Sequence, residues 1–168
     1  MTYYIGQTLG LIGAGCSLVL PLLKKKSHML AMAMATNGLA ALNLLLIGQF
    51  GSAAIIHFLA VIQALVTLLS VRKESVITRT ESIIFLFLYV ACGLLGYTRP
   101  LDLIPIVGSL FNMLATFQRD VQKTRTLILI NVSFFLVYYV IVGSSSAFMV
   151  LSTIITTTIA MYRHKKRH

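Results

Sequence analysis

Residues 41–69 read ALNLLLIG-QFGS-AAIIHFLAVIQALVTLL, two apolar runs joined by a short uncharged turn and followed by Arg72 and Lys73. An apolar run of about 20 residues is long enough to span the hydrocarbon core of a bilayer as a helix. A turn this short joins only antiparallel neighbours. The stretch therefore predicts a helical hairpin inside a membrane, and it places one histidine, His57, at membrane depth.

The composition of the whole chain is that of a membrane protein. Of its 168 residues, 58% are hydrophobic and 11% are charged, and the mean hydropathy is +0.90. A soluble domain of this size needs more charge to cover its surface. Seven apolar runs predict an all-α bundle with helices at about 2–23, 29–47, 50–71, 82–98, 103–118, 126–142 and 147–162.

The basic residues predict how the chain crosses the membrane. Thirteen of the fourteen Lys and Arg follow every second apolar run, in clusters at 24–26, 72–79, 119–125 and 163–167, and Arg99 is the exception. Because cytoplasmic loops are rich in Lys and Arg, this predicts seven spans with a periplasmic N-terminus and a cytoplasmic C-terminus. An alternative makes the fourth and fifth helices one re-entrant pair. Clustering of the charge also favours contact with anionic lipid over nucleic-acid binding.

Two parts of the chain share one layout. Residues 1–73 and 100–168 each predict three helices, with Gly48 matching Gly143, Asn37 matching Asn131, and basic loops in the same places. Residues 74–99 then form a linker and a linker helix. Two triplets separated by one helix have the same orientation, which is a 3+1+3 parallel repeat. Such repeats place a site at their shared interface near the bilayer midplane.

This layout resembles the SWEET and PQ-loop transporters. More specifically, the asparagine-containing second helix, the segment LLLIGQFGSAAIIHF and the Arg72-Lys73 stop resemble the bacterial YgjV family of inner-membrane proteins, over nearly the whole chain. The resemblance implies a bacterial inner membrane and a SWEET-type fold. The chain departs from the SWEET sugar site, because it has no Trp, and helix seven offers Ser152, Thr153 and Thr156 where that family uses asparagine.

Several polar side chains fall at membrane depth, where an unpaired polar group is costly unless it faces water. Neutral amides and imidazole supply both donors and acceptors to a polar solute, so they predict solute-binding residues. The alternative is a set of hydrogen bonds that hold helices together, with His57 bonded to Asn43 or Asn112. The candidates are His57, Gln63, Asn43, Asn112, Asn37 and Asn131.

The sequence predicts transport rather than chemistry. No carboxylate lies at membrane depth, and the histidines and two cysteines form no metal or catalytic motif, so we expect no enzyme activity, metal or cofactor. The leading hypothesis is facilitative transport of a small polar solute, with Pro21, Gly48 and Gly51 as hinges. The alternatives are a structural or accessory subunit and a lipid-handling protein with a side opening near the 24–26 or 119–125 loops. A homo-oligomer is also possible.

Overall fold

The computed structural model describes residues 1–23, 25–73, 79–118 and 120–165. Over these residues the chain forms seven α-helices and no strand, which confirms the predicted all-α fold. Two 3₁₀ turns, η1 (Leu20–Leu22) and η2 (Pro100–Asp102), precede α2 and α5. The helices are α1 (Thr2–Val19), α2 (Lys26–Leu46), α3 (Ser52–Arg72), α4 (Arg79–Leu95), α5 (Leu103–Phe117), α6 (Val121–Val142) and α7 (Ser146–Lys165).

Two helix ends differ from the sequence prediction for physical reasons. The first α-helix ends at Val19 rather than near residue 23, because Pro21 lacks an N–H group and the chain continues as a 3₁₀ turn. The sixth helix begins at Val121, five residues earlier than expected. Asp120 caps it, since its Oδ1 accepts the backbone N–H of Gln122 at 2.7 Å.

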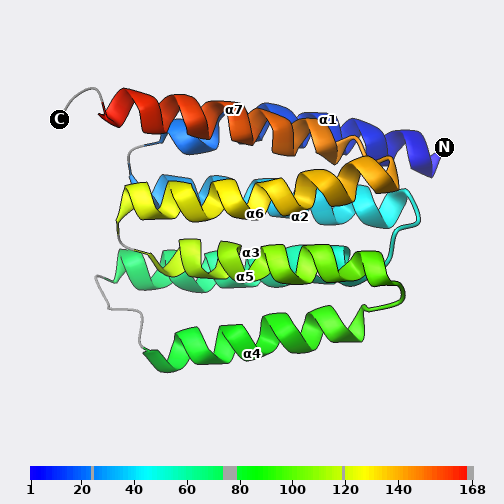
Figure 1. Ribbon diagram of the computed structural model, residues 1–168, viewed down its shortest axis with the longest axis horizontal. Helices are drawn as coiled ribbons and strands as arrows, with labels where there is room; N and C mark the ends of the chain where they lie inside the picture. Colours follow the sequence, from blue (N-terminus) through cyan, green and yellow to red (C-terminus); the bar gives the residue numbers. More distant parts are fainter. Residues whose placement is uncertain (24, 74–78, 119, 166–168) are drawn as a thin grey trace.

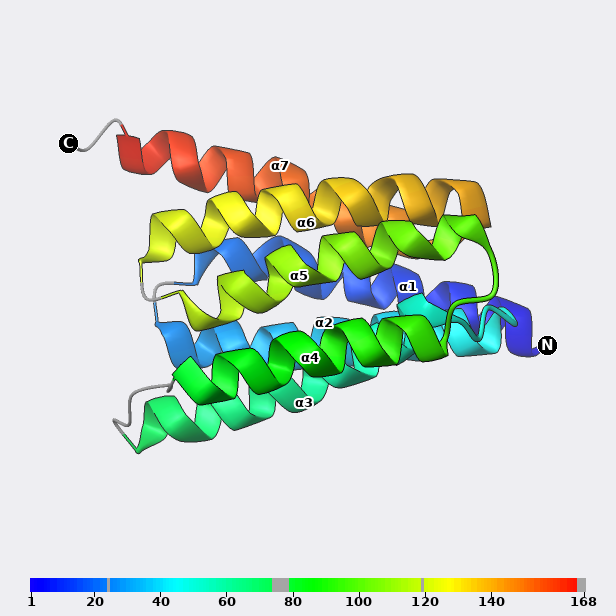
Figure 2. The ribbon, with the colours of Figure 1, turned by 60° about the horizontal axis from the view of Figure 1, so that its bottom comes forward.

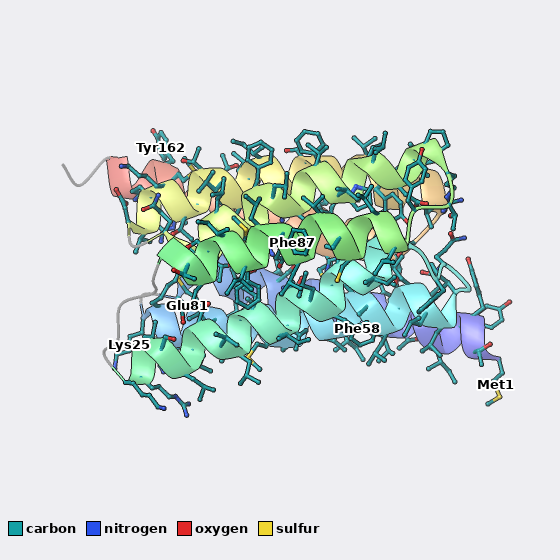
Figure 3. All side chains as sticks on the ribbon, turned by 90° about the horizontal axis from the view of Figure 1, so that it is seen from below. Met1, Lys25, Phe58, Glu81, Phe87 and Tyr162 are labelled. Carbon is teal, nitrogen blue, oxygen red and sulfur yellow. The ribbon has the colours of Figure 1, made fainter. Side chains whose placement is uncertain are left out.

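The helices lie side by side along one axis and alternate in direction (Figure 1). The first helix therefore begins at one end of the bundle, and α7 ends at the opposite end. Met1 marks the first of these, called here the outer end, and Lys25 and Glu81 lie at the other, the inner end (Figure 3). The triplet α1–α3 runs in the same directions as the triplet α5–α7, which is the arrangement that a parallel repeat requires.

Six of the helices form a closed ring. Around it, α1 packs on α2, α2 on α3, α3 on α5, α5 on α6, α6 on α7, and α7 on α1. Helix α4 lies outside the ring against α3 and α5 (Figure 2). Replacing α1, α2 and α3 by α5, α6 and α7, and the reverse, turns this list of contacts into itself. The packing thus agrees with a two-fold repeat, although the repeat itself and its boundaries at 73 and 100 remain predictions.

The two matched glycines end equivalent helices in the same way. Gly48 after α2 and Gly143 after α6 have φ of +80° and +69°, a left-handed conformation that glycine adopts without a steric penalty. After α2, the N–H of Gln49 donates to the carbonyl of Leu44 at 2.8 Å. After α6, the N–H of Ser144 donates to the carbonyl of Tyr139 at 3.0 Å. Both ends are Schellman motifs, so Gly48 and Gly143 are turn residues by conformation.

A large apolar surface surrounds the bundle. Phe87 on α4 is 71% exposed, and Phe58 on α3 also points outward (Figure 3). Four segments are long and apolar enough to cross a membrane, namely Lys26–Leu46, Ser52–Arg72, Pro100–Phe117 and Val121–Val142. Shorter apolar helices cover Thr80–Leu95 and Ser146–Tyr162. A surface of this kind is stable in lipid rather than in water. Seven crossings, and which end faces the cytoplasm, remain predictions.

Candidate functional site

A cavity of about 110 Å³ lies inside the six-helix ring. A single water needs about 10–15 Å³ of such space, so the cavity has room for several waters or a small solute. All six ring helices contribute to its lining. The walls are mainly apolar. The polar lining residues are Ser17, Lys26, Thr36, Asn37, His57, Asn112, Thr116, Thr124, Asn131, Tyr139 and Thr153.

His57 stands at the centre of a hydrogen-bonded triad on the cavity wall. Its Nδ1 lies 2.8 Å from Asn37 Oδ1, and its Nε2 is bonded to the Tyr139 hydroxyl. The Asn37 amide nitrogen donates to the carbonyl of Ala33 at 2.8 Å, so its oxygen must be the acceptor of the pair. His57 Nδ1 therefore carries the proton, and Tyr139 donates to Nε2. With a neutral imidazole, both ring nitrogens of His57, the Asn37 oxygen and the Tyr139 hydroxyl each have a hydrogen-bond partner.

The triad differs from the partners expected from the sequence. The alternative interpretation gave His57 an interhelical hydrogen bond to Asn43 or Asn112; His57 does bond between helices, but its partners are Asn37 and Tyr139. The bonds join α2, α3 and α6, and so both halves of the chain. Tyr139 was not predicted, because the candidates from the sequence were limited to amide and imidazole side chains. Its position eight residues after Asn131 on the same helix was the available signal.

Asn112 and Asn131 bring the second half of the chain to the same cavity. Both line it, and together with Asn37 and His57 they also line a second space of about 10 Å³. Asn131 Oδ1 is buried and has no hydrogen-bond partner among the described residues. A buried acceptor without a donor costs free energy unless water or a ligand supplies one. Four of the six predicted residues thus meet at one site.

Asn43 lies elsewhere, at the outer end, and is fully bonded. Its amide nitrogen donates to the carbonyl of Gly6 at 2.7 Å, and its oxygen accepts from the hydroxyls of Ser144 and Ser146. The side chain is completely buried and is not among the residues that line the cavity. Asn43 therefore ties α2 to α1 and to the α6–α7 turn.

Gln63 is also bonded away from the cavity. Its oxygen accepts from the Tyr89 hydroxyl at 2.7 Å, and its nitrogen lies 3.4 Å from the carbonyl of Met113. The side chain is fully buried and joins α3 to α4 and α5. Gln63 therefore attaches α4, the helix outside the ring, to two helices of the ring.

The outer end is closed by a second polar cluster around Asp102, which is 1% exposed. Its carboxylate accepts the N–H groups of Thr98 and Arg99 at 2.9 and 3.1 Å, and Arg99 in turn donates to Gln49 Oε1 at 2.7 Å. These bonds join the α4–α5 connection to the α2–α3 turn. Gly51 packs against the same connection, since a Cβ added to it would lie 3.6 Å from the carbonyl oxygen of Gly96. The turns at this end contribute no lining residue.

At the inner end the cavity wall contains a single charged residue among the described ones, Lys26. Its Nζ donates to the backbone carbonyls of Ala115 and Gln118, both at 3.4 Å, where α5 ends.

The three predicted hinge residues lie outside regular α-helix. Gly48 and Gly51 lie at the turn between α2 and α3, and Pro21 lies in η1 next to the inner end. Movement at any of them remains a prediction. No group of three potential metal ligands lies together in the described part of the chain.

The fold and the cavity define a helical membrane protein in which both halves of the chain contribute polar side chains to one partly open cavity. The chain belongs to the Imp-YgjV family, described as bacterial inner membrane protein, whose model matches residues 4–168. The family and the apolar helices support a location in the bacterial inner membrane. Neither the curated proteins nor the solved structures gave a match. The likeness to SWEET and PQ-loop transporters therefore remains a prediction.

Proposed function

We propose that the protein is a facilitative transporter of a small polar solute, which occupies the cavity between its two halves. The observation that carries the proposal is the origin of the polar lining. Asn37 and His57 come from the first triplet, and Asn112 and Asn131 come from the last. Transporters built from repeats place their site at such an interface, so that movement of one half against the other opens it to either side.

The roles of the lining residues follow from their hydrogen bonds. His57, Asn37 and Tyr139 satisfy one another and form a fixed wall. Asn131 has an acceptor that no described residue uses, so it is the residue that contacts the solute directly. Asn112 lies beside it on the wall of both spaces. Binding and passage need no chemical step, in keeping with the expectation that the protein is no enzyme.

A pair of alanines on α2 allows a matched test. Ala33 lines the cavity, whereas Ala35 is exposed on the same helix. We expect Ala33→Phe to lower solute flux in proteoliposomes to the level of protein-free vesicles, because the ring fills the cavity. Ala35→Phe should leave flux unchanged. The screen uses small neutral, anionic and cationic solutes. If no solute moves faster than in empty vesicles, or if both variants behave alike, the transport proposal is wrong.

The accessory-subunit alternative has its own support, since Asn43 and Gln63 are fully paired between helices. It predicts that no solute crosses and that all six amide and imidazole positions matter only for stability. The alanine pair therefore separates the two functions.

A further inference from the structure

Lys26 is an undercompensated charge on the wall of the cavity. Its side chain is half-buried, and the described residues give it two carbonyl oxygens, both at the long distance of 3.4 Å. The ion pair between Arg99 and Asp102 lies at the other end of the bundle. A charge removed from water is costly unless it is paired, and carbonyl dipoles compensate it only in part.

The described lining of the cavity carries no negative charge that would oppose an anion. Asp and Glu are missing from the lining among the residues that the structure describes. Two hydroxyl residues of the lining, Thr116 and Thr124, sit on the helix ends beside it. Two charges a few Å apart interact more strongly in a partly buried site than in water, because the effective dielectric constant is lower. The sign of this interaction favours anions and opposes cations.

We infer that Lys26 is an oxyanion-binding residue at the inner end of the cavity, and that the ligand carries a carboxylate or phosphate group. The inference rests on the proposed function, because it names the chemical class of the solute. An oxyanion would supply a counter-ion that none of the described residues provides to Lys26, and the remainder of a small ligand would lie toward Asn131 and Asn112. The same chemistry is found in a soluble organic acid and in the phosphate of an anionic lipid, which the experiment must distinguish.

A matched series of probes tests the charge preference. Glycerate, glycerol and protonated 3-aminopropane-1,2-diol have nearly the same size and differ in charge. We expect glycerate, and inorganic phosphate, to raise the thermal unfolding midpoint of the purified protein saturably at constant ionic strength. Glycerol and the amine should not. A second arm compares phosphatidylglycerol with phosphatidylcholine in mixed micelles.

Variants assign the effect to one lysine. Lys26→Met removes the charge and keeps much of the apolar stem, and we expect the affinity for glycerate to fall at least tenfold. Lys26→Arg should retain it. Lys25→Met is the matched control, since Lys25 is the exposed neighbour and is not a lining residue. A residue that only caps α5 would lower the midpoint when replaced and leave the effect of glycerate unchanged.

The outcomes separate the two proposals. Stabilisation by glycerate or phosphate that depends on Lys26 supports both the oxyanion site and a soluble solute. An effect of phosphatidylglycerol alone, also dependent on Lys26, supports the oxyanion site but contradicts transport of a small solute. Equal effects of glycerol and glycerate, or loss of the effect in Lys25→Met as well, overturn the inference even if flux through the cavity is found.

Discussion

The amides of this protein divide into two kinds, and a pair of substitutions tests the division. Asn43 is completely buried and bonded to Gly6, Ser144 and Ser146. Asn131 lines the cavity with an oxygen that has no partner among the described residues. We expect Asn43→Ala to destabilise the fold strongly, and Asn131→Ala to affect stability little while weakening solute binding.

The magnitude follows from the number of bonds removed. Side-chain hydrogen bonds between helices in a membrane average about 0.6 kcal/mol, with a maximum of about 1.7. Three bonds to Asn43 therefore predict a loss of about 2–5 kcal/mol in the free energy of unfolding. The carbonyl of Gly6 would also lose a donor. Removing the Asn131 side chain sacrifices no bond to its oxygen, so the expected cost is below about 1 kcal/mol.

The assay is reversible unfolding of purified protein in mixed micelles, followed by circular dichroism as the fraction of denaturing detergent rises. Ser133→Ala is the control, because Ser133 lies on α6 two residues from Asn131, is exposed, and bonds only to the carbonyl of Leu129 on its own helix. If Asn131→Ala lowers the unfolding free energy as much as Asn43→Ala, then both amides hold helices together and the division is wrong.

Three further substitutions test packing and the triad. A Cβ on Gly96 would lie 2.6 Å from the Ser52 backbone, whereas a Cβ on Gly15 would meet nothing within 4 Å. We therefore expect Gly96→Ala to lower the free energy of unfolding by about 1–3 kcal/mol or more in the same assay. Gly15→Ala should leave it unchanged or raise it slightly. Equal effects would contradict the close contact. Tyr139→Phe removes the hydroxyl that donates to His57 and should lower the unfolding free energy by about 1 kcal/mol; an unchanged value would refute that bond.

The sequence predicted the fold well because its main determinants are local. Apolar runs, short turns and Gly48 and Gly143 are visible one stretch at a time, and they placed all seven helices. The errors lie at ends decided by single side chains. Asp120 starts α6 five residues early, and Pro21 converts the end of α1 into a 3₁₀ turn. A prediction based on hydropathy gives no weight to such caps.

The site was predicted only in part, for a different reason. Residue type and depth identified four residues that line the cavity, yet Asn43 and Gln63 have the same type and similar surroundings in the sequence. Asn43 and Gln63 differ from the lining residues in having hydrogen-bond partners on neighbouring helices that use their side chains fully. The hydroxyl partners of Asn43 are 101 and 103 residues away in the sequence, so no local pattern reveals them. Lys26 was interpreted only as part of a basic loop that sets orientation and contacts anionic lipid, because nothing local shows that it reaches the end of α5.

The distribution of bonds also bears on how the proposed transporter would work. The polar lining reaches the inner end at Lys26, while the Asn43 and Asp102 clusters close the outer end. In the proposed transport cycle, a solute in the cavity would reach the outer side by separation of one of these clusters. Separation of the three Asn43 bonds costs about 2–5 kcal/mol on the values above, which corresponds to a population of the separated state of about 3% to 0.02%. The same bonds that stabilise the fold would therefore set how often the site opens outward, so stability and flux should change in opposite directions when Asn43 is replaced.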